Sequence, residues 1–123
     1  MGLNLTHTKI KALLDGVTTI SCYPVFVPVT ATYPAIAYYM TGLARDIQSN
    51  LNETTISLSS YTILIASKSF SESQDLAQDI VNKLDQYADE DFLLILVEDA
   101  ADEYDPEQGL FIKSLQITTR FKE

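Results

Sequence analysis

The amino-acid sequence predicts an α+β domain, and three observations lead to this prediction. Two segments, one near the N-terminus and one near the middle, place apolar residues at helical spacing. Two others, at 35–42 and 54–67, have strand composition and flank a polar stretch, as the arms of a hairpin do. Two more strand-like runs follow the second helical segment. With 123 residues and an apolar fraction of 46%, the chain fits one domain over 1–123.

The first helix is expected at about residues 4–15, and Gly16 stands where a helix often ends in the left-handed conformation. Its apolar stripe comprises Leu5, Ile10, Leu13, Leu14 and Val17. The next segment, "TTISCYPVFVPVTATYP", contains Pro24, Pro28 and Pro34, which cannot donate to a central ladder. We therefore expect a short strand and then an irregular arm.

The strands at 35–42 and 54–67 are predicted to form a long antiparallel hairpin around the polar segment "LARDIQSNLNE". The apolar alternation of the second strand changes phase near Ser59 and Ser60. Either a bulge or a strand that passes from solvent into the core would produce this change.

The second helix is predicted from a stripe that comprises Leu76, Ala77, Ile80, Val81, Leu84, Tyr87 and Ala88. Ser69 with Glu72 has capping-box spacing, and Ser71 with Gln74 has the same spacing. The serines around this helix start have no G-x-S-x-G elbow, S-x-x-K motif or neighbouring histidine. Capping and turn roles are therefore favoured over phosphorylation or a catalytic nucleophile.

The C-terminal third is expected to contain a buried strand, "DFLLILVEDA", an acidic turn, "ADEYDPEQG", and a long final strand, "LFIKSLQITTRF". In the final strand the predicted core face comprises Phe111, Lys113, Leu115, Ile117, Thr119 and Phe121.

A formal charge of −9 argues against wrapping nucleic acid, which needs clustered Lys and Arg. Ten of the seventeen acidic residues lie between Asp85 and Glu107, a stretch without Lys or Arg. We predict an acidic, repulsive surface made by Glu98, Asp99, Asp102, Glu103, Asp105 and Glu107. A bound cation is the alternative, but the EF-hand order of ligands is missing. We expect no metal, and the scattered glycines predict no nucleotide cofactor.

The remaining reactive residues do not indicate an enzyme. Cys22 is the single cysteine, so it has no internal disulfide partner, and its apolar surroundings predict a buried side chain. His7, the single histidine, is expected on a helix surface, and no motif links it to Cys22. The longest apolar run, Phe92–Val97, is too short to span a bilayer, and no signal peptide is evident, so we expect a soluble intracellular protein without a membrane partner.

The order of elements resembles the tail completion or tail terminator proteins of long-tailed bacteriophages. The closest match is at Tyr33–Tyr39, an extended strand with a P-x-hydrophobic start, and at Tyr61–Leu84, a strand that runs through a serine-rich turn into a helix striped with alanine and leucine. By order of elements the resemblance covers roughly two thirds of the chain.

The resemblance implies a mixed, mainly antiparallel β-sheet packed by two α-helices. It also implies a virion protein, assembled in the host cytoplasm, that forms a ring of six at the head-proximal end of the tail. Such a ring ends growth of the tail tube and joins the tail to the head connector, so tail tube protein and head connector protein are the implied partners. DNA would pass without specific binding, and the family has no catalytic residues to carry over.

Within this reading, the polar hairpin tip at 42–53 is predicted to contact a neighbouring subunit or the tube. Its candidate interface residues are Leu43, Arg45, Asp46, Ile47, Asn50, Leu51, Asn52 and Glu53. The acidic surface would line a channel and discourage duplex DNA from binding. Two alternatives stay open: a neck or head completion protein of the same virion, and a small ligand-binding or catalytic domain.

Overall fold

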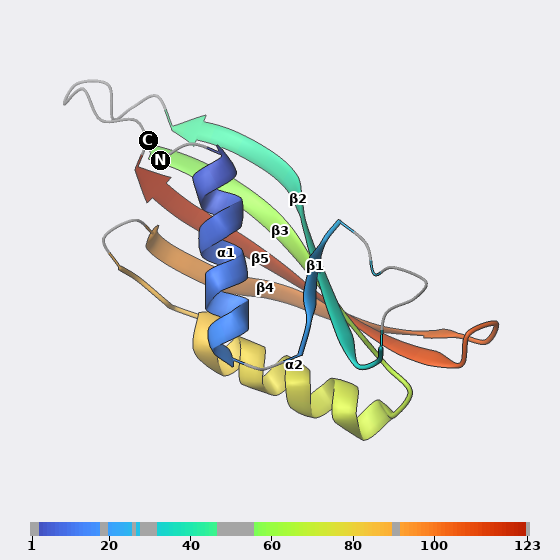
Figure 1. Ribbon diagram of the computed structural model, residues 1–123. Helices are drawn as coiled ribbons and strands as arrows, with labels where there is room; N and C mark the ends of the chain where they lie inside the picture. Colours follow the sequence, from blue (N-terminus) through green and yellow to red (C-terminus); the bar gives the residue numbers. More distant parts are fainter. Residues whose placement is uncertain are drawn as a thin grey trace.

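The computed structural model describes residues 3–17, 20–25, 27, 32–46, 56–89 and 92–122. In chain order, the elements are α1 (Leu3–Val17), β1 (Cys22–Pro24), β2 (Ala35–Asp46), β3 (Ile56–Ser67), α2 (Phe70–Leu84), β4 (Phe92–Asp105) and β5 (Leu110–Lys122). The strands form one sheet in the order β1-β2-β3-β5-β4. β1 runs parallel to β2, whereas the other neighbouring strands are antiparallel. The predicted α+β class and the mixed, mainly antiparallel sheet are confirmed (Figure 1).

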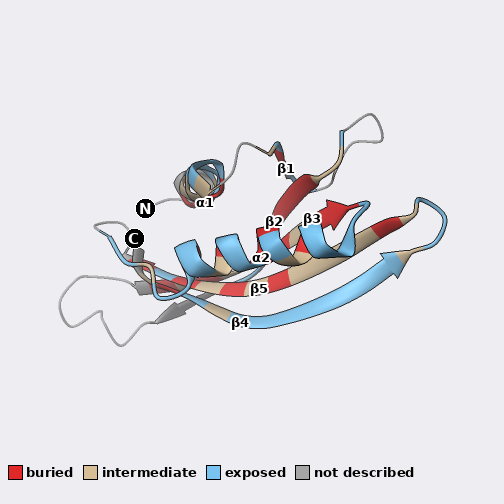
Figure 2. Cartoon of the chain, turned by 90° about the horizontal axis from the view of Figure 1, so that it is seen from below, coloured by how far each residue is buried: buried red, intermediate tan, exposed pale blue. Residues whose placement is uncertain are grey.

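Both helices lie on the same side of the sheet, and neither covers the opposite face, as Figure 2 shows. The core lies between these two layers. α1 contributes Ile10 and Leu14 to it, and α2 contributes Leu76, Ile80 and Leu84. Each such side chain stabilises the fold by about 1.5–3 kcal/mol when it is fully buried. We call the sheet side that packs against the helices the helix face, and the opposite side the open face.

The predicted core face of the final strand is confirmed. Leu115, Ile117, Thr119 and Phe121 are almost completely buried, and Lys113 shares their side of β5. Alternate residues such as Gln116 point to the open face, because successive side chains of a strand point to opposite sides.

The first helix is longer than predicted at both ends. It runs from Leu3 to Val17, so Gly16 lies inside α1, and its φ is not positive. The prediction of a left-handed end at Gly16 is therefore wrong. Val17 packs against the core, and this apolar contact stabilises the helical turn that follows the glycine.

The predicted hairpin is confirmed as β2 and β3, but the phase change near Ser59 and Ser60 was misplaced. Ser57, Ser59 and Tyr61 all lie on the helix face, so the alternation of β3 is unbroken. The irregularity lies in β2, between Met40 and Gly42. Because Ser57 and Ser59 occupy inward positions, the apolar residues alone do not show the alternation of the strand.

The stripe of α2 is confirmed at Leu76, Ala77, Ile80 and Leu84, which are buried. The helix nevertheless ends at Leu84 with Asp85 as its C-cap, so Tyr87 and the exposed Ala88 lie beyond it. Gln86 adopts a left-handed φ of 62° directly after this cap and donates its backbone N–H to the carbonyl of Ile95. The chain turns here toward β4, and this turn ends the helix.

The predicted boundary between a buried strand and an acidic turn is wrong. β4 runs on through Asp105, and the turn occupies only 106–109, where Gly109 has a φ of 65°. Nor is β4 a buried strand, since Ile95 is buried but Leu96 and the acidic half of the strand are exposed. The reason is position: β4 is at the edge of the sheet and pairs along its length with β5.

Candidate functional surfaces

The serines at the start of α2 form a capping relay. The Ser69 hydroxyl accepts the Glu72 backbone N–H at 3.4 Å, while the Ser69 N–H donates to the Ser67 hydroxyl oxygen at 3.1 Å. Ser67 in turn donates its hydroxyl to the Glu72 carboxylate. The predicted cap at Ser69 is thus confirmed, with Ser67 inserted between the two ends of the capping box. Ser73 donates to the Phe70 carbonyl at 2.7 Å, so these hydroxyls make local, structural bonds.

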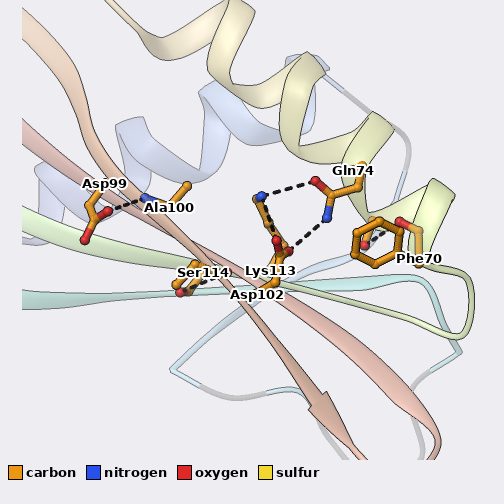
Figure 3. Close-up of polar contacts among 9 residues, drawn as sticks. Phe70, Gln74, Asp99, Ala100, Asp102, Lys113 and Ser114 are labelled. Atoms are coloured by element: carbon orange, nitrogen blue, oxygen red, sulfur yellow. Dashed lines mark hydrogen bonds and ion pairs between the residues drawn. The ribbon is translucent and has the colours of Figure 1, made fainter.

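Gln74 does not extend the cap at Ser71, contrary to its spacing in the sequence. It belongs instead to a triangle with Lys113 and Asp102 (Figure 3). Lys113 Nζ lies 3.1 Å from Gln74 Oε1 and 3.3 Å from Asp102 Oδ2, and Gln74 Nε2 lies 2.9 Å from Asp102 Oδ1. The three groups tie α2 to β4 and β5. They also give the largely buried Lys113 side chain, which is 15% exposed, a counter-charge.

The six acidic residues of the predicted repulsive surface lie on β4 and in its turn, but they do not share one face. Asp102 pairs with Lys113 across the strands, on the helix side, whereas Glu103 pairs with Ile112 on the open side. Several of the carboxylates have structural partners. Asp99 Oδ1 accepts the Ala100 N–H at 2.8 Å, and Asp105 Oδ1 accepts the Glu107 N–H at 3.0 Å.

The other acidic residues are more available. Glu98, Glu103 and Glu107 are exposed, and none of their three carboxylates has a hydrogen bond or ion pair with another described residue. Only part of the predicted acidic surface therefore presents free carboxylates to a partner. Sequence patterning alone treated all six side chains as equivalent.

The predicted interface at the β2–β3 hairpin tip is described only at its base. Leu43 is 42% exposed at the distal part of β2, and the backbone of Arg45 and Asp46 pairs with β3. Five predicted residues lie outside the described residues, namely Ile47, Asn50, Leu51, Asn52 and Glu53. The contact role of this tip stays a prediction.

An exposed aromatic cluster, which sequence reasoning missed, lies at the other end of the sheet. Phe70 is 51% exposed and Tyr104 is 55% exposed, and both rings pack against Phe111. The ring centroids of Phe70 and Phe111 are 5.7 Å apart, and those of Tyr104 and Phe111 are 4.8 Å apart. We call these three residues the aromatic ridge. The sequence did contain a signal for this cluster: Phe70 lies at a helix start and Tyr104 lies in an acidic stretch, and large aromatic side chains are unexpected at such polar positions.

Shallow hollows run along the open face. One, of about 420 Å³, is lined by residues that include Tyr39, Thr62 and Gln116. Another, of about 270 Å³, is lined by Leu58, Leu94, Leu96, Glu98, Thr118 and Arg120, and we call it the leucine hollow. A third, of about 210 Å³, lies near Val25 and Leu110. Thr62 donates its hydroxyl to Gln116 Oε1 at 2.9 Å, so the polar pair in the first hollow is mutually satisfied.

The cysteine and the histidine have structural surroundings. Cys22 is buried, as predicted, and its Sγ lies 3.6 Å from the Ile20 carbonyl oxygen. Burial, reinforced by the Asp15 carboxylate, raises the pKa of the Cys22 thiol to about 11, so the thiol is neutral at physiological pH.

His7 is half-buried rather than on the helix surface, because its ring packs edge-on against Tyr61 at 5.3 Å between centroids.

Two features are absent from the residues that the structure describes. Within those ranges, no three His, Cys, Asp or Glu side chains gather as metal ligands would. No helix there has the length and apolar character needed to cross a membrane.

Comparison with known proteins gives one kind of match. No protein-family model matches the chain, and no curated protein matches it in sequence. Among solved structures, the fold is similar to that of a chain in the virion of a native gene transfer agent particle. The TM-score is 0.61 at 10% sequence identity, and the match covers 91% of this chain and 86% of the other. The same arrangement of helices and strands therefore occurs, nearly end to end, in a chain of that particle.

Proposed function

We propose that this protein is a structural component of a phage-like virion. The observation that carries the proposal is the fold shared with a chain of a gene transfer agent virion, which extends over 91% of this protein. The phage tail resemblance in the sequence, read independently from Tyr33–Tyr39 and Tyr61–Leu84, points to the same class. We further propose that the protein acts by assembly and not by catalysis.

The specific role we propose is that of a tail terminator. Copies of the chain form a ring, with six as the expected number, at the head-proximal end of the tail. This ring ends growth of the tail tube and joins the tail to the head connector. The exposed aromatic cluster and the separate leucine-lined hollow support an assembled state, because clustered exposed apolar side chains often mark sites of protein–protein contact.

The acidic charge fits a channel that DNA crosses. Phosphate contacts dominate the affinity of proteins for DNA, so carboxylates at a channel wall would keep the duplex from binding. Glu103, which is exposed and has no ion pair among the described residues, is the first candidate for that wall. Asp102 is a weaker one, because its charge is balanced by Lys113.

The test is addition of the purified protein to growing tail tubes, followed by electron microscopy and by native mass measurement of the protein alone. We expect rings at one end of each tube and a narrow length distribution. Tubes that lengthen without limit and carry no added density would refute the terminator role. Binding to isolated head connectors, with no binding to tubes, would instead identify a neck protein.

A further inference from the structure

Two exposed apolar surfaces of the chain differ in shape. The aromatic ridge of Phe70, Tyr104 and Phe111 projects from the helix side of the sheet, beside the β4–β5 turn. The leucine hollow is a depression of about 270 Å³ on the open face, and its lining Leu96 is 38% exposed. Aromatic side chains that enter apolar pockets are the usual anchors of protein interfaces.

The charges of the two surfaces are complementary. Arg120 lies at the leucine hollow and is exposed, and its guanidinium makes no hydrogen bond or ion pair with another described residue. On the ridge side, Glu107 lies in the turn at 106–109 that joins the strands of Tyr104 and Phe111, and its exposed carboxylate has no such partner, whereas Glu103 points to the open face. A guanidinium in this position can pair with a carboxylate and also stack on an aromatic ring. Glu98 shares the hollow with Arg120, so the hollow is not purely basic.

One chain cannot bring its own ridge and hollow together. Phe111 and Arg120 are nine positions apart on β5, which corresponds to about 30 Å along a strand. They also point to opposite faces of the sheet, since Phe111 shares its side with Leu115 whereas Arg120 does not. A contact between the ridge and the hollow therefore needs two copies of the chain.

We propose that the aromatic ridge of one copy docks into the leucine hollow of the next copy, head to tail. This interface rests on the proposed assembly of the protein into a ring. Contacts between two different surfaces of identical chains propagate from copy to copy, and they close into a ring when the rotation between copies permits. A ridge-to-ridge contact would stop at a dimer.

Disulfide trapping tests the interface, because it records even a short-lived contact. A Tyr104→Cys variant and a Leu96→Cys variant are prepared separately, mixed in equal amounts and mildly oxidised. Each keeps two of the three apolar anchors of its own surface. We expect heterodimer in the mixture on the order of tenfold above control, because docking holds the thiols at a high effective concentration. The control mixture replaces Leu96→Cys with Gln78→Cys, at an exposed position on α2.

Each outcome has a definite reading. Heterodimer no more abundant than in the control mixture overturns the interface, even if the wild-type protein forms rings on tubes. Equally strong homodimers of either variant alone would show contact between like surfaces and also overturn it. Trapped heterodimer with tubes that still grow without limit would support the interface and refute the terminator role. Thermal melts of all variants confirm that each one is folded.

Discussion

At the scale of single residues, a buried hydroxyl is tolerated or costly according to whether it has a partner. Ser57 and Ser59 lie two positions apart on the same side of β3, and both are fully buried. Ser59 shares a hydrogen bond with the Thr119 hydroxyl. Ser57 Oγ has no partner among the described residues. The two serines are equally buried on the same strand and differ in their side-chain hydrogen bonding, so each serves as the comparison for the other.

We expect opposite effects from the two alanine substitutions. Ser59→Ala should lower the free energy of unfolding by about 0.5–1.5 kcal/mol, because the hydroxyl–hydroxyl bond is lost while Thr119 keeps the Ser59 carbonyl as an acceptor at 3.3 Å. Ser57→Ala should leave stability unchanged or raise it, since it removes an unsatisfied hydroxyl. Urea unfolding of both variants measures the difference. An equal loss of unfolding free energy in the two variants would show that the Ser57 hydroxyl makes a hydrogen bond as stabilising as that of Ser59.

The cap of α2 makes a second prediction at this scale. Ser69→Ala should destabilise the protein by about 1 kcal/mol, since the Glu72 N–H loses its acceptor at the helix start. Assembly of the folded protein should be unaffected, because the bond is local. Ser71→Ala, at the exposed neighbour in the same turn, is the control. Loss of assembly in a Ser69→Ala protein of normal stability would point to a functional role for this hydroxyl.

At the scale of elements, α2 is held to the sheet by one apolar stripe. Ile80 is at its centre and fully buried, so Ile80→Asp would place an unpaired charge in the core. That penalty is comparable with the whole stability of a small domain, about 5–15 kcal/mol. We expect insoluble or unfolded protein, as judged by circular dichroism and solubility. Ser71→Asp, on the exposed first turn of the helix, should fold normally. A soluble Ile80→Asp protein with a cooperative melt would contradict the packing of α2.

The elements also show how far sequence reasoning extends. Strong periodicity predicted α2 and the inward face of β5, because both follow a single repeat over many residues. The extent of β4 was missed because its acidic half looks like a turn, and pairing with β5 keeps it extended. The triangle of Gln74, Asp102 and Lys113 joins residues from three elements, so no local pattern could reveal it. The aromatic ridge was missed for the same reason, since Phe70 and Tyr104 meet through Phe111.

At the scale of the whole molecule, one helix layer on one side of the sheet leaves the other face open (Figure 2). That face is lined in part by leucine side chains, and the aromatic ridge lies on the helix side, at the start of α2. A net charge of −9 opposes association of identical chains through long-range repulsion. A specific interface between copies therefore has to combine apolar contact with local charge pairing. At the leucine hollow, the leucine side chains can supply the apolar contact and the Arg120 guanidinium can supply the charge pairing.

Alkaline pH tests the packing of the whole fold, because buried acidic groups in it resist ionisation. Burial, assisted by Asp15, raises the pKa of Cys22 from 9.0 to about 11. As pH rises through this window the unfolded chain loses the thiol proton first, so the native state binds more protons and stability falls. This contribution is fully present below about pH 9. Between pH 9 and 11, the free energy of unfolding should fall by up to about 1.4 kcal/mol per pH unit.

The tyrosines steepen the decline at higher pH, since burial also raises the pKa of Tyr38 and of Tyr61 above 10.0. Urea titrations at closely spaced pH values on wild type and Cys22→Ala separate these contributions. From pH 9 to 10 we expect Cys22→Ala to decline less steeply than the wild type, because the thiol contribution is absent and the tyrosines of the unfolded chain are only partly ionised. Above pH 10 it should decline with the wild type, because both tyrosines are retained. Parallel curves for the two proteins over the whole range would show that Cys22 is not shielded from solvent, and that the contact of α1 with β1 is looser than described.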